Sequence, residues 1–184
     1  MLSREFLEGF RNQTETRWRK TSLDSRIYGF QLQAGTRWCT GLLDEQILAY
    51  ENDVSIQFPL DFKVLLRSMN GTDIPTVNIY GSSGEPTRHA IGVYSYPRDL
   101  ALVRQLILEV SESREVLSAT LEEEGFDLSP NAKLMPIYAH RYVVCDQAME
   151  NCPVLSIWDA EDAIIYGHTL REYLEREFLG ENST

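Results

Sequence analysis

The side chains that most often bind metals or transfer protons are few in this chain and far apart. Its three histidines are His89, His140 and His168, and none has a second histidine three or four residues away. A metal-binding pair on one helix face needs that spacing. The histidines by themselves therefore predict no metal site, and we expect surface rings or locally hydrogen-bonded ones.

The cysteines also lack the spacing of a reactive or metal-binding pair. Cys39, Cys145 and Cys152 are odd in number and form no C-x-x-C motif, so neither a disulfide framework nor a zinc ribbon is predicted. Cys145 and His140 lie an odd number of residues apart on one predicted strand, so their side chains face opposite sides of the sheet. That geometry argues against a nucleophile and base pair, and we expect buried thiols.

Two further segments have compositions that suggest ligand binding. The Asp159-Ala160-Glu161-Asp162 turn carries carboxylates for a cation but lacks the Asp-x-Asp-x-Asp-Gly spacing of a calcium loop. The loop over residues 81–86 contains two glycines but lacks the Gly-Lys-Ser/Thr ending of a phosphate-binding loop. A G-x-S-x-G elbow and a dinucleotide fingerprint are also absent from the sequence. We therefore predict no catalytic residues, no metal and no cofactor, and expect a protein that is not an enzyme.

The net charge of −11 is distributed unevenly along the chain. Residues 1–40 hold seven Lys and Arg and four Asp and Glu, which gives +3; residues 41–184 hold ten and twenty-four, which gives −14. An acidic body disfavours nucleic-acid binding, which depends on neutralising phosphates with Lys and Arg. It favours a basic partner, although acidity also serves to keep a protein in solution.

The basic N-terminal segment has two interpretations. The Arg17-Trp18-Arg19-Lys20 cluster follows a helical pattern that begins near Ser3. An RNA-binding surface is one interpretation, but four residues in front of an acidic body do not make a basic groove. We favour the other, an amphipathic helix that carries this basic end and packs on the core.

The chain has no sequence feature of a membrane or secreted protein. Its longest apolar runs are far shorter than the roughly 20 residues of a membrane span. Residues 1–5 lack the basic and then apolar order of a signal peptide. We expect a cytoplasmic location.

The elements that position these residues are clearest between residues 40 and 71. Apolar residues at helical spacing predict one helix that starts after an N-cap at Thr40 and continues to Val54. A second helix is predicted from Pro59, which suits a first turn, and Asn70-Gly71 is expected to end it through a left-handed residue. Neither helix is expected to be stable without a covering layer.

The C-terminal third predicts an antiparallel meander. Residues 133–138, 141–145, 153–158 and 163–166 are apolar runs separated by short turns, and strands also fit residues 76–80 and 89–95. Thr169 and Glu172 form a capping box for a final helix. With a helical region over residues 97–127, the chain predicts an α+β single domain with a mainly antiparallel sheet of about 4–6 strands. N-terminal, inserted and C-terminal helices are expected to flank that sheet.

One set of residues resembles a known family. An acidic residue, a spacer, a proline, an acidic-aromatic pair, an apolar helix and Asn-Gly form the N-terminal signature of the SUKH superfamily, whose founding member is a fungal regulator of cell-wall synthesis. The matching residues are Glu51, Phe58, Pro59, Asp61, Phe62, Asn70 and Gly71. Thr72 departs from the pattern, since many members have a second glycine there.

The resemblance also extends to the order of elements. Residues 40–80 and 133–179, about half of the chain, are similar to the SUKH arrangement. It implies a SUKH-like domain over residues 40–184 with an insertion at about 97–127, preceded by a helix and an extended segment over residues 1–39.

The resemblance implies a non-enzymatic protein-binding role. Many bacterial members are immunity proteins that bind and neutralise one toxin domain, often a nuclease or a deaminase. A nuclease surface is basic, so an acidic partner would suit it. We expect acids and aromatics at the turns of the meander to make the contact. These residues are Asp146, Trp158, Asp159, Glu161, Asp162 and Tyr166.

Two alternatives remain open from the sequence. One is an intracellular scaffold or regulatory module of the same family, which a neighbouring toxin gene would argue against. The other is a small enzyme that uses clustered carboxylates, which a pocket with convergent acids and a metal would support. The sequence leaves the partner, the oligomeric state and the role of residues 97–127 open.

Overall fold

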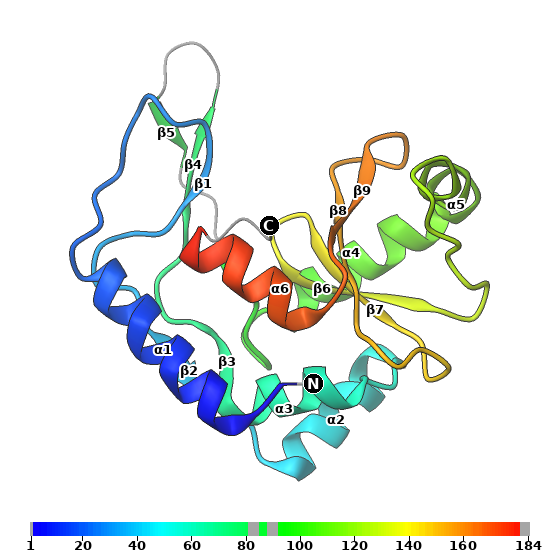
Figure 1. Cartoon of the computed structure of the whole chain (residues 1–184), viewed down its shortest axis with the longest axis horizontal. Coiled ribbons are helices and arrows are strands. Elements are labelled where there is room, and N and C mark those ends of the chain that lie inside the picture. The colour runs from blue at the N-terminus through cyan, green and yellow to red at the C-terminus, as the bar shows by residue number, and fades with distance from the viewer. Residues whose placement is uncertain (1, 81–84, 88–91, 181–184) are drawn as a thin grey trace.

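A four-stranded antiparallel meander occupies the middle of the molecule (Figure 1). Its strands are β6 (Lys133–Tyr138), β7 (Arg141–Cys145), β8 (Val154–Ile157) and β9 (Ala163–Gly167), and they pair in chain order. The structure is a computed structural model that describes residues 2–80, 85–87 and 92–180. The predicted meander is confirmed, because each strand pairs antiparallel with the next strand in the chain.

The two faces of this sheet contribute to two separate hydrophobic cores. Along β7, Val143 and Cys145 belong to one buried cluster, whereas Tyr142 and Val144 belong to the other. Side chains of a strand alternate between faces, so a strand that is apolar at every position needs cover on both sides. The helices supply that cover in two layers.

The larger core lies between one face of the sheet and the N- and C-terminal helices. Those helices are α1 (Arg4–Trp18), α2 (Asp44–Val54), α3 (Leu60–Ser68) and α6 (Leu170–Leu174), which continues into the π-helical segment η1 (Glu175–Leu179). Thr169 caps α6 by accepting from Glu172 N at 3.1 Å, while the Glu172 carboxylate accepts from His168 N at 2.9 Å. The predicted capping box is therefore shifted by one residue on its acidic side.

The smaller core is built on the region predicted to be an insertion. That region contains α4 (Leu100–Glu112) and α5 (Arg114–Glu123), and the fully buried Leu117 and Leu121 of α5 pack against the second face of the sheet. Most of α4, including the fully buried Val103, packs in the larger core instead. Val110, near the end of α4, joins the same cluster. Helix α5 and the end of α4 therefore cover an apolar sheet face that would otherwise be exposed to water.

The remaining strands form two small antiparallel sheets. A three-stranded sheet of β1 (Gly29–Gln31), β4 (Val77–Tyr80) and β5 (Glu85–Thr87) projects from the body, and β2 (Trp38–Thr40) pairs with β3 (Met69–Thr72) (Figure 1). The strand predicted over residues 76–80 is β4. Of the strand predicted over residues 89–95, residues 89–91, including His89, lie outside the described residues, and Val93 makes a single bridge to Tyr138.

Two predicted helix ends are wrong. Helix α2 begins at Asp44 after Leu43, and Thr40 lies in β2 instead of capping a helix. Helix α3 ends at Ser68 because Met69 is already extended, so Asn70-Gly71 lies inside β3. The Asn70 amide donates to Tyr96 O at 2.7 Å and accepts from Tyr96 N at 2.9 Å. Asn-Gly therefore joins two distant segments and does not close a helix.

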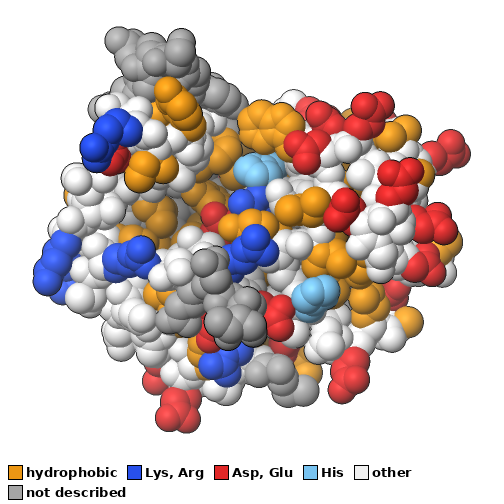
Figure 2. All heavy atoms as spheres, turned by 45° about the horizontal axis from the view of Figure 1, so that its top comes forward, with side chains coloured by type: hydrophobic (Ala, Val, Ile, Leu, Met, Phe, Trp, Pro, Cys, Tyr) orange, Lys and Arg blue, Asp and Glu red, His pale blue; other side chains and the backbone are white. Residues whose placement is uncertain are grey.

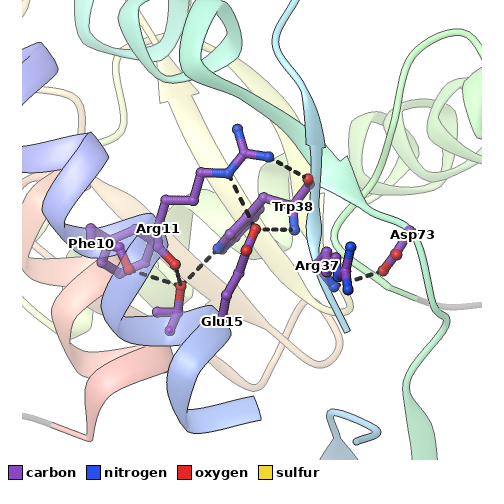
Figure 3. A network of polar contacts seen from close by, with 7 residues as sticks. Phe10, Arg11, Glu15, Arg37, Trp38 and Asp73 are labelled. Carbon is purple, nitrogen blue, oxygen red and sulfur yellow. Dashed lines mark hydrogen bonds and ion pairs between the residues drawn. The ribbon is translucent and has the colours of Figure 1, made fainter. Parts of the chain in front are cut away.

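The N-terminal helix is attached to β2 by a polar network (Figure 3). The Trp38 indole N–H donates to Thr14 Oγ1 at 2.9 Å, and Arg11 donates to Trp38 O at 3.0 Å. At the basic end of α1, Trp18 is 3% exposed and Arg17 donates to Leu179 O at 2.6 Å. The basic cluster thus contributes to the packing of α1 on the C-terminal segment, as the second interpretation of residues 17–20 expects.

The residues that carry the family resemblance hold the α2–α3 corner together. Glu51 Oε1 accepts from Phe58 N at 2.6 Å and forms an ion pair with Lys63 Nζ at 2.8 Å. Pro59 is the N-cap of α3 and Phe62 is buried beside Phe58, with ring centroids 5.0 Å apart. Asp61 accepts from Leu2 N at 3.1 Å, which connects α3 to the N-terminus.

Replacement of Glu51 by alanine is expected to destabilise this corner by about 2–3 kcal/mol, because a buried N–H and a nearby ammonium lose their shared charged acceptor. Urea denaturation measures the loss. The matched control is Lys63→Gln, which removes the ion pair but leaves the Glu51 acceptor for Phe58 N, and it should cost less than half as much. Equal losses in the two variants would contradict a structural role for the hydrogen bond.

Candidate partner-binding face

The residues predicted to contact a partner fall in three places. Trp158, Asp159, Glu161 and Asp162 lie together in the turn between β8 and β9. Asp146 follows β7 at the opposite end of the sheet, where its carboxylate accepts from Ala148 N at 2.9 Å. Tyr166 lies on β9 beneath arginine side chains and Asp146 is also partly covered, so neither is as exposed as the turn.

The β8–β9 turn has a defined local structure. Asp159 Oδ1 accepts from Glu161 N and Asp162 N, each at 2.9 Å, and Trp158 N donates to Asp162 O at 3.0 Å. This is the Asx-type bonding by which an aspartate organises a turn. The side chains of Glu161 and Asp162 are not needed for it and remain exposed.

Helix α5 extends this acidic turn into a larger surface. Thr120 Oγ1 donates to Ala160 O at 2.8 Å, which joins the C-terminal half of α5 to the turn. Within the described part of the chain, the exposed acids of the two elements form no ion pair. We call this surface the acidic face; it comprises Glu122, Glu123, Glu124, Asp159, Glu161 and Asp162. Figure 2 shows acidic side chains gathered on this side of the molecule.

An aromatic cleft borders the acidic face at Trp158. It separates the three-stranded sheet from the β6–β7 turn and has a volume of about 580 Å³. Figure 2 shows hydrophobic side chains on both sides of a hollow with basic and histidine side chains inside it. The lining residues are Tyr28, Gly29, Phe30, Asn78, Ile79, Tyr138, Ala139, His140, Arg141, Trp158 and Glu177.

The imidazole of His140 lies between the two sides of the cleft. Its centroid is 6.2 Å from the ring of Phe30 on β1 and 5.4 Å from the ring of Trp158, which it meets edge to face. Burial, with a smaller contribution from the charge of Arg141, lowers the pKa of His140 to about 4. The ring is therefore neutral at physiological pH.

Arg141 is held in place on three sides. Its Nε donates to Glu177 at 2.8 Å, its Nη1 donates to Ser156 Oγ at 2.7 Å, and its guanidinium lies 3.7 Å from the centroid of the Tyr166 ring. Arg176 lies near the same ring at 4.2 Å, so Tyr166 contacts two guanidinium groups. Burial opposes the charge of Arg141, but Glu177 outweighs it and the pKa of the guanidinium is raised.

The cleft and the acidic face offer groups for stacking, hydrogen bonding and charge pairing. Cys145 lies at the far end of β7 from His140, and burial raises the pKa of its thiol well above the usual value. The described residues contain no cluster of three or more His, Cys, Asp or Glu side chains able to hold a metal ion. What the cleft offers is aromatic surface, hydrogen-bond acceptors and a neutralised ion pair.

Sequence reasoning identified one wall of this region and missed the rest. Trp158 was predicted as a contact residue from its place at a turn, and it is 56% exposed. Tyr28 and Phe30 were not among the predicted contact residues, yet Tyr28 is 58% exposed at the edge of the cleft. The cleft combines residues 28–30, 78–79, 138–141, 158 and 177, and no spacing in the sequence connects them.

No protein-family model matches the chain, and no curated protein matches it either. Among the described residues, no helix has the length and apolar character needed to cross a bilayer.

Proposed function

We propose that this protein binds a basic protein partner through the acidic face and the adjoining side chain of Trp158, without catalysing a reaction. The observation that carries the proposal is the exposed indole of Trp158 at the edge of a surface whose acids form no ion pair with any of the described residues. Interfaces are anchored by exposed aromatic side chains, and unpaired charges of one sign accelerate association with the opposite sign.

The resemblance to the SUKH superfamily makes the proposal more specific. It supports an immunity protein that neutralises a toxin domain, and the acidic face suits a nuclease, whose substrate-binding surface must be positive. Glu51 and Asn70, two of the residues that carry the resemblance, make hydrogen bonds within the fold. Partner binding would then depend on other residues, such as those of the acidic face. The alternative within the same family is a scaffold or regulatory module.

The first experiment is affinity capture. The tagged chain is expressed in its native host, captured at low salt and eluted with a salt step, and the co-eluting proteins are identified by mass spectrometry. We expect one stoichiometric basic partner that is toxic when it is expressed alone. Recovery of the chain without such a partner would favour the scaffold alternative.

The second experiment measures association kinetics with that partner. The triple variant Asp159→Asn, Glu161→Gln, Asp162→Asn removes three charges but leaves an oxygen at position 159 to organise the turn. We expect the association rate constant to fall about tenfold at low salt and to depend less steeply on salt, because steering scales with the charge of the surface.

A matched control separates local from total charge. Glu5, Glu45 and Glu150 are exposed, outside the acidic face and without ion pairs in the described residues, so their replacement by glutamine changes net charge equally. This control should change the association rate much less. If both triple variants behave alike, the acidic face is not the contact surface.

A further inference from the structure

Two buried hydrogen-bonding atoms in the aromatic cleft have no partner among the described residues. They are Asn78 Oδ1 and His140 Nδ1, and both residues line the cleft. Asn78 is only 2% exposed. A buried polar atom without a hydrogen-bond partner costs about 1–3 kcal/mol of stability. Two such atoms beside one cleft therefore suggest that a ligand or water forms hydrogen bonds with them.

The cleft also presents flat apolar surface at its entrance. Tyr28, just before β1, and Trp158, just after β8, are both more than half exposed, and the ring of Phe30 contacts that of His140. Aromatic faces carry partial negative charge and attract cations, with the indole the strongest. The surface therefore suits a planar group that is apolar on its faces and positive overall.

The charges around the cleft select against an anion. Among the described residues that line the cleft, Arg141 is the one cation, but its side chain is 12% exposed and it is paired with Glu177 at 2.8 Å. The neighbouring turn adds Asp159, Glu161 and Asp162 directly after Trp158. A phosphate or carboxylate would meet these acids without a free counter-charge, whereas a cation would be attracted.

We infer that the aromatic cleft receives an arginine side chain of the basic partner, with the guanidinium stacked on Trp158 and donating to Asn78 Oδ1 and His140 Nδ1. The inference rests on the proposed function for the existence of a partner and adds the chemistry of its anchor residue. A donor at Nδ1 selects the His140 tautomer with its proton on Nε2.

Arginine fits these groups better than the other side chains of a basic protein. A guanidinium is planar, presents five donors and is weakly hydrated, so it stacks and donates at the same time. A lysine ammonium is compact and strongly hydrated and does not stack. An apolar side chain would fill the cleft but leave both acceptors unpaired.

The inference can be tested on the protein alone with small probes. The chain has three tryptophans, and Trp18 and Trp38 are 3% and 4% exposed, so Trp158 is the one whose indole a solute reaches readily. N-acetylarginine amide is titrated while the Trp158 indole N–H signal is followed by NMR, with the signal assigned from Trp158→Phe. N-acetylcitrulline amide is the uncharged analogue, and Nα-acetyllysine amide is the non-planar cation.

We expect a saturable shift with the arginine probe and at least about tenfold weaker binding of the citrulline probe, since hydrogen bonds from a charged donor are the stronger ones. His140→Phe keeps a ring between Phe30 and Trp158 but removes the acceptor, and it should weaken the arginine probe severalfold. The control His168→Phe replaces an exposed histidine outside the cleft and should have no effect.

Equal affinity for the arginine and citrulline probes, or a shift that does not saturate, would overturn the inference without any variant having to fold. These results are separable from the proposed function, because the probes test the cleft and the acid variants test the partner. If partner association depends on the acidic face but the cleft does not bind the arginine probe, the proposed function is supported and the arginine anchor is rejected.

Discussion

Replacement of Gly71 by alanine is expected to lower the free energy of unfolding by about 2–5 kcal/mol, a large part of the roughly 5–15 kcal/mol that holds a typical domain folded. Two separate effects contribute. Gly71 has φ of 73°, and a side chain in the left-handed region costs roughly 1–2 kcal/mol. An added Cβ would also lie 2.6 Å from both Val93 O and Tyr94 O, which are backbone atoms. Forcing them apart adds about 1–3 kcal/mol.

The clash matters because this segment connects the sheets. Thr72 N donates to Val93 O at 3.2 Å, and Tyr94 N donates to Ile137 O at 3.0 Å, so residues 93–94 lie between β3 and the meander strand β6. Displacing them would disturb both sides at once. The larger core contains Val93 and Tyr94, and therefore the loss should appear as reduced global stability and not as local fraying.

Two other glycines separate the contributions. Gly125 has φ of 81° with nothing within 4 Å of an added Cβ, so Gly125→Ala should cost only the roughly 1–2 kcal/mol of strain. Gly9 lies inside α1 with open space around it, and Gly9→Ala should stabilise the protein by about 0.5–1 kcal/mol. Chemical denaturation of the three variants gives the order. A Gly71→Ala loss no larger than that of Gly125→Ala would rule out the close approach.

These residues also show where sequence reasoning succeeds. The meander and the final helix were predictable because each depends on neighbours in the chain, such as alternating apolar residues or the Thr169 hydroxyl that caps α6. Asn70-Gly71 resembled a helix end because Asn and Gly are the residues that most often adopt the left-handed conformation at the end of a helix. Its true place in β3 depends on residues 93–96, whose proximity no local pattern reveals.

The aromatic cleft was hidden for the same reason. His140 was expected to have a surface or locally hydrogen-bonded ring, and residues 141–145 were predicted only as a strand. Their roles come from Phe30, Trp158 and Glu177, which approach them only through three different elements. The acidic turn was found because its residues are consecutive, whereas its extension onto α5 depends on the tertiary hydrogen bond from Thr120.

Replacement of Arg141 by alanine is the second change with a large expected effect, about 3–5 kcal/mol of lost stability. The Arg141 and Glu177 side chains are 12% and 15% exposed, so the variant leaves a largely buried carboxylate without its counter-ion. It also removes the guanidinium that contacts Ser156 and covers the Tyr166 ring. The double variant Arg141→Met, Glu177→Gln removes both charges and should recover most of the loss, since a neutral pair needs no compensation.

The same variant should show a characteristic dependence on pH. Burial and the nearby charge of Arg141 lower the pKa of His140 to about 4, so the wild type loses stability as the pH falls from about 6.5 toward 4. Arg141→Ala removes the second of these causes and should lose less stability over the same range. The difference in stability between variant and wild type should therefore be smaller at low pH.

Urea denaturation at pH 7 and pH 4.5 measures the difference in stability between variant and wild type. An NMR titration of His140 measures the change in its pKa directly. The pKa of His140 should rise in Arg141→Ala but remain below its ordinary value, because burial is the larger of its two causes. If the difference in the free energy of unfolding is the same at both pH values, the charge of Arg141 does not contribute to the low pKa of His140.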